Sequence, residues 1–304
     1  MRPRAALIAA LIVTLSTIPA TAQGSRDALV VSTSWLSQHL NDANLVILHL
    51  GTKTDYDAAH VPGARFLTMS DVALNDTSEN GLSLQMPAAD DLRARLEQAG
   101  ISDGSRIVAY YTRDRISSAT RVLFTLDYAG LGKQVSLLDG GFEAWTREGH
   151  PVTTDVPPAT PGTLSPLTIQ SSIVDAEFVK AHLAAPGYAI VDGRTTAFYS
   201  GAQTGGSAQR PHKTGHITGA KNVPYTDTLT DAQMLKSPDA LKALFSSAGV
   251  KTGDTIVAYC HIGQQATAVI FAARTLGYKV LLYDGSFEDW SRHADYPVTN
   301  LIKK

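Results

Sequence analysis

Short apolar runs alternate with amphipathic stretches along this chain, a pattern that predicts strands followed by helices. Apolar runs of strand length occupy residues 45–50, 106–111, 134–138 and 255–259. Helical spacing is found at residues 90–98, 117–128, 142–148 and 265–276, and in a short stretch ending at Leu40 that Ser32 and Thr33 can cap. Polar segments at 57–64 and 71–87 indicate a turn and a loop. The alternation predicts an α/β fold in which mainly parallel sheets are flanked by helices on both faces.

The pattern occurs twice, because three sequence blocks of the first half recur in the same order in the second. His-Val-Pro-Gly-Ala at 60–64 recurs as His-Ile-Thr-Gly-Ala at 216–220, and Ile-Val-Ala-Tyr at 107–110 recurs at 256–259. Asp-Gly-Gly-Phe-Glu-Ala-Trp at 139–145 recurs as Asp-Gly-Ser-Phe-Glu-Asp-Trp at 284–290. Between the halves, residues 151–166 contain five prolines, which favour an extended linker. We therefore expect two tandem domains, at 23–153 and 171–304, joined by a linker at 154–170.

The composition is that of a globular protein with no strong charge. The chain has 304 residues, of which 44% are hydrophobic and 18% charged, and its formal net charge is −2. It is long enough for two ordinary domains, and it has no broad basic surface to attract nucleic acid. Nucleic acid is therefore not an expected partner.

The N-terminus has the three parts of a secretory signal. Arg2 and Arg4 precede an apolar stretch at 5–18, and the small residues Ala20 and Ala22 predict cleavage before Gln23. A membrane anchor is the weaker alternative, because the apolar stretch is shorter than the roughly 20 residues that a spanning helix needs. We expect a signal peptide at 1–22, a periplasmic or secreted protein, and no stable membrane insertion after cleavage.

Cys260 is the only cysteine, and it lies where a predicted strand gives way to a predicted helix. The backbone N–H groups from His261 to Gln265, together with the positive end of the helix, could stabilise an anion there. Gly263 would allow the tight loop that this requires. A thiol in such surroundings is a candidate nucleophile, whereas the alternative is a buried cysteine that acts as a small hydrophobe.

The paired blocks and the segment Cys-His-Ile-Gly-Gln-Gln-Ala-Thr at 260–267 resemble a tandem-domain rhodanese, a sulfurtransferase of the thiosulfate or 3-mercaptopyruvate type. The resemblance covers nearly the whole chain after the signal. It implies that the second domain is catalytic and that the first is a non-catalytic copy, because Tyr111 stands where Cys260 stands in the repeat.

The family implies that the Cys260 thiolate takes sulfur from a small anionic donor. The resulting persulfide would be held by the loop His261, Ile262, Gly263, Gln264 and Gln265, and would then pass its sulfur to cyanide or a thiol. The resemblance implies no metal and no organic cofactor. Thiosulfate is favoured over 3-mercaptopyruvate as the donor.

The residues around Cys260 depart from the family in two places. His261 and Ile262 are neither the basic residues of thiosulfate enzymes nor the small residues of mercaptopyruvate enzymes, and Phe198 occupies the place of a donor-binding arginine. The cations that we consider for donor binding are Arg194 of the Asp-Gly-Arg block and, as replacements, Arg210, His212 and Lys213 on the Gly-rich insertion before His216, which could equally be a solvated loop. Arg194 could instead pair with Asp192 and brace the fold. His216 and Asp284 are interpreted as structural, and His261 is expected to face solvent.

Two other functions compete with sulfurtransferase activity. A cysteine phosphatase would have an arginine six residues after the nucleophile, but Ala266 stands there, so the sequence does not favour this class. A persulfide carrier or binding module with weak catalysis remains the alternative, because the arginine expected at Phe198 is missing.

Overall fold

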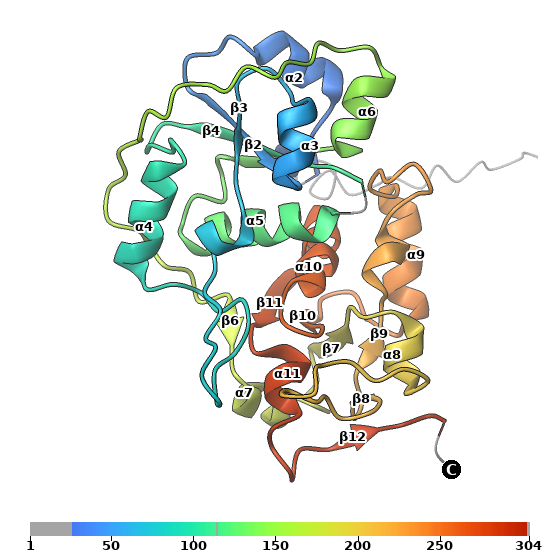
Figure 1. Cartoon of the computed structure of the whole chain (residues 1–304). Coiled ribbons are helices and arrows are strands. Elements are labelled where there is room, and N and C mark those ends of the chain that lie inside the picture. The colour runs from blue at the N-terminus through green and yellow to red at the C-terminus, as the bar shows by residue number, and fades with distance from the viewer. Residues whose placement is uncertain (1–25, 114, 303–304) are drawn as a thin grey trace, which may run out of the picture.

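The computed structural model describes residues 26–113 and 115–302, which form two lobes joined by an extended segment (Figure 1). The predicted signal peptide at 1–22 lies outside the described residues. Each lobe has a five-stranded parallel sheet flanked by helices, which confirms the predicted α/β fold. Among the described helices, none is both long and apolar enough to cross a membrane.

The first lobe has the strand order β1-β5-β4-β2-β3. Its strands are β1 (Val30–Val31), β2 (Leu45–Leu50), β3 (Ala64–Phe66), β4 (Arg106–Tyr111) and β5 (Val135–Leu138). Its helices are α2 (Thr33–His39), α3 (Lys53–Ala58), the 3₁₀ helix η1 (Met69–Asp71), α4 (Ala89–Gln98), α5 (Ile116–Tyr128) and α6 (Gly141–Arg147).

The second lobe has the equivalent order β6-β11-β10-β7-β9, so the sequence repeat is also a repeat of topology. Its strands are β6 (Ile173–Val174), β7 (Tyr188–Asp192), β9 (Lys221–Asn222), β10 (Thr255–Tyr259) and β11 (Lys279–Tyr283). Its helices are α7 (Ala176–Ala181), α8 (Thr196–Ser200), η2 (Tyr225–Thr228), α9 (Pro238–Ser247), α10 (Gln265–Thr275) and α11 (Ser286–Trp290). A separate antiparallel pair joins β8 (His216–Ile217) to β12 (Val298–Thr299).

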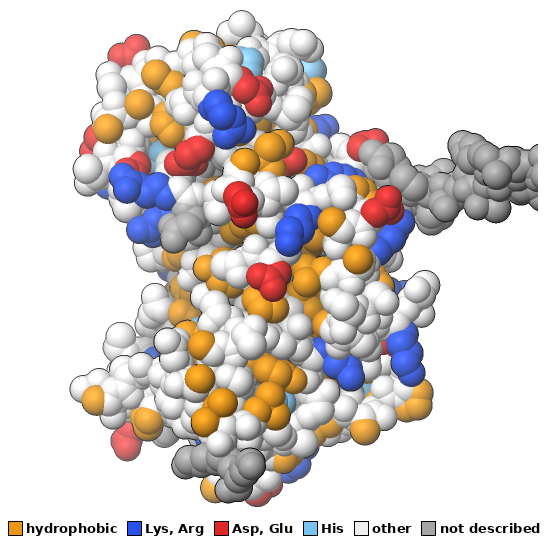
Figure 2. Space-filling view, turned by 90° about the vertical axis from the view of Figure 1, so that its right-hand side faces the viewer, with side chains coloured by type: hydrophobic (Ala, Val, Ile, Leu, Met, Phe, Trp, Pro, Cys, Tyr) orange, Lys and Arg blue, Asp and Glu red, His pale blue; other side chains and the backbone are white. Residues whose placement is uncertain are grey.

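The two lobes share one hydrophobic core, in which α5 packs against α10 (Figure 1). Alternation along β10 explains which side chains enter it, because successive residues of a strand point to opposite faces of a sheet. Ile256 and Ala258 belong to the shared core, whereas Val257 and Tyr259 pack on the outer face with α7 and α11. In Figure 2 the molecule narrows between the lobes, and hydrophobic side chains are visible at this junction.

The proline-rich segment between α6 and β6 is extended and bound along the first lobe. The Gly162 amide donates to the Glu97 carbonyl (2.7 Å), and the Gln170 amide donates to the Tyr128 carbonyl (2.8 Å). Because these bonds fix the connection, the second lobe begins at a defined place beside α5. The predicted domain boundaries at 153 and 171 stay a prediction.

Candidate active site

Cys260 directly follows β10 and is fully buried at the face that the second lobe turns toward the first. Its side chain shares the common core with Ala258, as the alternation along the strand requires. In the first lobe, Tyr111 at the end of β4 is also buried, and its hydroxyl donates to the Gln233 carbonyl. Tyr111 therefore fills the place where the second lobe has its thiol.

The loop after Cys260 has its carbonyl groups anchored by neighbouring donors. The Phe287 amide donates to the Cys260 carbonyl (3.1 Å), and the Glu288 amide donates to the His261 carbonyl (2.9 Å). The Gly263 carbonyl accepts from Nη1 of Arg121 on α5 (3.1 Å). These donors lie on α11 and in the first lobe, so both lobes hold the loop.

The anchored carbonyls determine where the next amides point. In a trans peptide the C=O and the following N–H point in opposite directions, and the described backbone has no cis peptide bonds. The amides of His261, Ile262 and Gln264 therefore point away from the groups that bind the carbonyls. Across the described residues, no amide from 261 to 265 donates to a protein acceptor. These N–H groups are available to bind an anion.

Gly263 is required by the shape of this loop. Its φ of 81° lies in the left-handed region, which side chains other than that of glycine rarely adopt. A Cβ atom there would lie 2.8 Å from the Asp284 carbonyl oxygen and 3.0 Å from Nη1 of Arg121. The loop therefore needs glycine both for its backbone conformation and for the close approach of Arg121.

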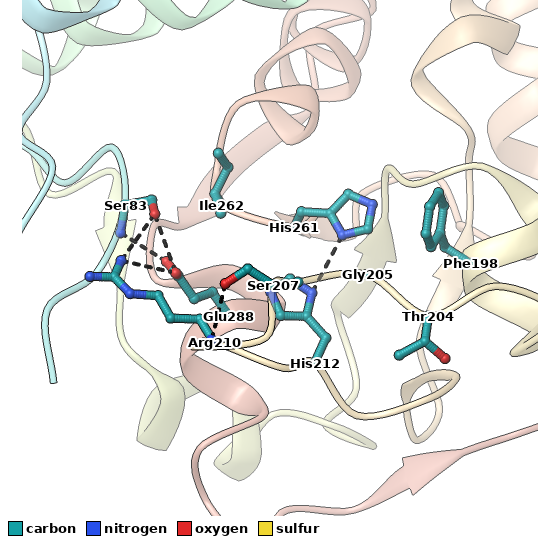
Figure 3. Close-up of a pocket in the computed structure, with 11 residues that line it drawn as sticks. Ser83, Phe198, Thr204, Gly205, Ser207, Arg210, His212, His261, Ile262 and Glu288 are labelled. Atoms are coloured by element: carbon teal, nitrogen blue, oxygen red, sulfur yellow. Dashed lines mark hydrogen bonds and ion pairs between the residues drawn. The ribbon is translucent and has the colours of Figure 1, made fainter. Parts of the chain in front are cut away.

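A pocket of about 510 Å³ adjoins the loop at His261 and Ile262 (Figure 3). The rest of its lining comes mainly from the Gly-rich segment after α8 and from first-lobe and α11 side chains: Ser83, Phe198, Thr204, Gly205, Gly206, Ser207, Arg210, His212 and Glu288. Cys260 itself is fully buried and is not among the residues that line this pocket.

Two histidines and a phenylalanine form one side of the pocket (Figure 3). The Nδ1 atoms of His261 and His212 are 3.5 Å apart, and the Phe198 ring meets His261 edge-on with centroids 4.6 Å apart. Burial, together with the nearby Arg194 charge, lowers the pKa of each histidine to about 4. Both are neutral at pH 7. His261 is thus part of the pocket wall, and the expectation that it faces solvent is wrong.

Arg194 is buried and engaged on two sides of its guanidinium. Nε and Nη2 donate to the Asp192 carboxylate, with Nη2 2.6 Å from Oδ2, and Nη2 also donates to the Gly215 carbonyl (2.8 Å). The guanidinium carbon lies 4.0 Å from the centre of the Phe287 ring, and Arg194 interacts electrostatically with Cys260. Arg194 therefore braces the site, and a role in donor binding stays a prediction.

Arg210 and Lys213, the other two cations predicted to bind the donor, both have their charged groups bound by protein atoms. Arg210 lines the pocket, but its Nη1 pairs with Glu288 (3.2 Å) and its Nη2 donates to the Asp76 carbonyl (2.5 Å). The Lys213 ammonium donates to the carbonyls of His293 and Tyr296, and Lys213 is not in the pocket lining. The structure brings Arg210 to the pocket with its charge balanced, and it does not bring Lys213 there.

Sequence reasoning missed the first-lobe side chains that complete the site. Arg121 is fully buried, and Ser83 donates through its amide to Glu288 (2.8 Å) and through its hydroxyl to the same carboxylate. Asp284, interpreted as structural, accepts from Arg121 (2.6 Å) and from the Met86 amide (3.2 Å), so it bonds across the two lobes. In sequence, the only signal for Arg121 is a charged residue inside the apolar helix predicted at 117–128.

The described residues bring no three potential metal ligands together. What the site offers to a ligand is one buried thiol, a set of free backbone amides and a largely neutral pocket. Such an arrangement suits a nucleophilic sulfur that becomes a covalently held anion.

The family model of the Rhodanese-like domain matches this chain twice, at residues 32–148 and 175–293. Thiosulfate sulfurtransferase of Rattus norvegicus is 31% identical over 279 residues, covering 87% of this chain and 92% of the relative. The 3-mercaptopyruvate sulfurtransferase of Mus musculus is 30% identical, covering 90% and 92%. Sulfur carrier protein TtuD of Thermus thermophilus is 29% identical, covering 89% and 96%.

Solved structures with the same fold include YnjE, at a TM-score of 0.79 and 24% identity, covering 90% of this chain and 68% of that one. A structure of EanB in complex with ergothioneine aligns with a TM-score of 0.78 at 22% identity, covering 93% and 72%. At this level of identity the likeness extends to the fold alone.

Proposed function

The chain belongs to the family of proteins with Rhodanese-like domains, and from this premise we propose that it transfers sulfur through a persulfide on Cys260. The observation that carries the proposal is the loop after Cys260, in which three anchored carbonyls leave three amides free to face an anion. A persulfide sulfur is such an anion, and preorganised N–H donors stabilise it without having to reorganise during the reaction.

The proposed reaction has two displacement steps. In the first, the Cys260 thiolate attacks the outer sulfur of the donor, a new S–S bond forms, and the donor's bond to that sulfur breaks. The electron pair leaves with the donor remnant, which is sulfite when the donor is thiosulfate. In the second, cyanide or a thiolate attacks the outer sulfur of the persulfide, and the thiolate of Cys260 is restored.

We propose thiosulfate rather than 3-mercaptopyruvate as the preferred donor. Both donors are anions, but the carboxylate of mercaptopyruvate is separated from its sulfur by two carbon atoms, so it would need partners of its own in the pocket when it leaves water. In the pocket Arg210 is already paired with Glu288, both histidines are neutral, and Phe198 stands in the place of the family's arginine. A compact donor that relies on the loop amides is therefore favoured.

A persulfide carrier with slow turnover is the second candidate. Its support is the full burial of Cys260, which would protect a bound persulfide from water, and the similarity to a sulfur carrier protein. A carrier would load one sulfur per chain rapidly but release it slowly to small acceptors. An enzyme would release it at a rate similar to the loading rate.

We further propose that the protein acts in the periplasm or outside the cell. The support is the sequence at 1–22, with its basic start, apolar stretch and small-residue cleavage site. Sequencing the N-terminus of the protein from a periplasmic extract tests this. Gln23 is the expected first residue, and a chain retained in the cytoplasm with its first 22 residues would contradict it.

Steady-state turnover tests the assignment of activity and donor. Thiosulfate and 3-mercaptopyruvate are compared as donors, with cyanide and a dithiol as acceptors, in the wild type and in Cys260→Ser. We expect turnover that is faster with thiosulfate and absent in the variant. Equal rates in the two proteins would contradict the role of Cys260, and faster turnover with mercaptopyruvate would contradict the donor assignment.

A further inference from the structure

Arg121 reaches the persulfide loop from the lobe that has no nucleophile. It lies on α5, is fully buried, and donates to three groups: the Gly263 carbonyl (3.1 Å), Oδ1 of Asp284 (2.6 Å) and the Leu84 carbonyl (2.5 Å). Building on the proposed function, we propose that Arg121 is a positioning residue that aims the Gln264 amide at the sulfur of Cys260.

The peptide between Gly263 and Gln264 shows how this works. Its carbonyl is fixed by Nη1 of Arg121, so the N–H of Gln264 at the other end of the same planar unit points the opposite way. The peptides that follow Cys260 and His261 are turned by amides of the second lobe itself. Of the three anchored peptides, this one alone depends on the first lobe.

The contribution of Arg121 is orientation rather than net charge, because the Asp284 carboxylate balances its cation within the same buried cluster. A planar guanidinium can hold a carboxylate and two carbonyls at fixed angles, which a single lysine ammonium cannot do. Gly263 is matched to it, since a Cβ there would lie 3.0 Å from Nη1. The arginine and the glycine therefore fit as a pair.

Among the described residues, the loop after Tyr111 in the first lobe receives no such arginine from the opposite lobe. When the Ile-Val-Ala-Tyr blocks are aligned, the position of Arg121 corresponds to Ile270 on α10, an apolar residue of the shared core. Asp139, the counterpart of Asp284, faces Arg26 at 3.7 Å, from a segment that precedes β1. In the part of the chain that the structure describes, an arginine thus reaches across to the loop with the nucleophile and not to its counterpart. This gives the non-catalytic lobe a direct part in the site.

Two variants separate positioning from stability. Arg121→Lys keeps the charge but cannot hold all three acceptors. The double variant Arg121→Met with Asp284→Asn removes both charges, so that no unpaired ion remains in the core. The matched control is Arg274→Met, which removes an ion pair between α10 and α5 (Arg274 Nη2 to Asp127 Oδ1, 2.9 Å) without touching the loop.

The readouts are the rate of persulfide formation from thiosulfate and the pH midpoint of Cys260 alkylation by iodoacetamide. In both Arg121 variants we expect persulfide formation to slow by about ten- to a hundredfold, the effect of a small misplacement of a catalytic group. We expect the alkylation midpoint to rise by about one pH unit, which corresponds to a tenfold loss of thiolate stabilisation. Arg274→Met should change neither.

A rate and a midpoint that stay at wild-type values in folded Arg121 variants, or that change equally in Arg274→Met, would overturn the inference. The outcome is distinct from failure of the proposed function. If the wild type forms no persulfide, sulfur transfer is wrong, but the alkylation midpoint still shows whether Arg121 positions the loop around the thiol.

Discussion

Replacing Gly263 by alanine tests the geometry of the loop, because the structure predicts both a backbone cost and a steric one. At a φ of 81°, an alanine costs about 1 to 2 kcal/mol in the left-handed region. Its Cβ would also lie 2.8 Å from the Asp284 carbonyl oxygen, a backbone atom that can move only if its strand end shifts. Overpacking of this kind costs about 1 to 3 kcal/mol.

Gly277, at the other end of α10, provides the matched control. Its φ is 82°, and a Cβ built there meets nothing within 4 Å, so Gly277→Ala has the same backbone cost without the steric one. We expect Gly277→Ala to lower the free energy of unfolding while sulfur transfer continues at the wild-type rate. Gly263→Ala should displace the carbonyl from Arg121 and slow persulfide formation by about ten- to a hundredfold.

The assay is rapid-quench mixing with thiosulfate followed by intact-mass measurement of the persulfide, with urea unfolding measured on the same preparations. The two variants are compared at a temperature where both are folded. A Gly263→Ala protein that forms its persulfide as fast as Gly277→Ala would refute the reasoning, since the loop conformation would then make no difference to the chemistry.

Two further predictions concern the pocket. His212 has its pKa lowered to about 4 by burial, whereas an unfolded histidine titrates near 6.5, so between these values the unfolded chain binds a proton that the folded chain does not. The free energy of unfolding should therefore fall as the pH drops from 7 to 5, with about 2 kcal/mol of the fall due to His212. Urea unfolding of His212→Gln should show a pH dependence that is smaller by this amount. An unchanged pH dependence would contradict a neutral, buried His212. Glu288 binds both Arg210 and Ser83 at the pocket. Glu288→Gln should weaken these contacts by about 1 kcal/mol, so iodoacetamide should alkylate the buried Cys260 about threefold to tenfold faster. An alkylation rate equal to that of the wild type would show that these contacts do not limit access of the reagent to Cys260.

The fold was predictable where the chain has long apolar runs. The strands at 45–50, 106–111 and 255–259 have the predicted bounds, because each is a nearly continuous apolar segment buried on both faces. Strands β1, β6 and β9 were not predicted. Each is two residues long and is defined by pairing with a distant strand, so local sequence contains no period to detect.

The site was predictable only in its local part. Cys260 and Gly263 stand out in sequence, since a lone thiol and a loop glycine between a strand and a helix need no distant partner to be recognised. The ion pair between Arg194 and Asp192 is present, as their two-residue spacing allows. Arg121 could not be assigned, because it acts on Gly263 across a separation of 142 residues, and only the packing of α5 on α10 brings the two together.

The mass of the intact protein after brief exposure to thiosulfate and removal of excess donor tests the central claim most directly. We predict that the wild type gains the mass of one sulfur atom, located on Cys260 by peptide mapping, and that cyanide removes it with formation of thiocyanate. Cys260→Ser should gain nothing. A wild type that gains no sulfur, or one whose added sulfur is not released to an acceptor, would contradict sulfur transfer through Cys260.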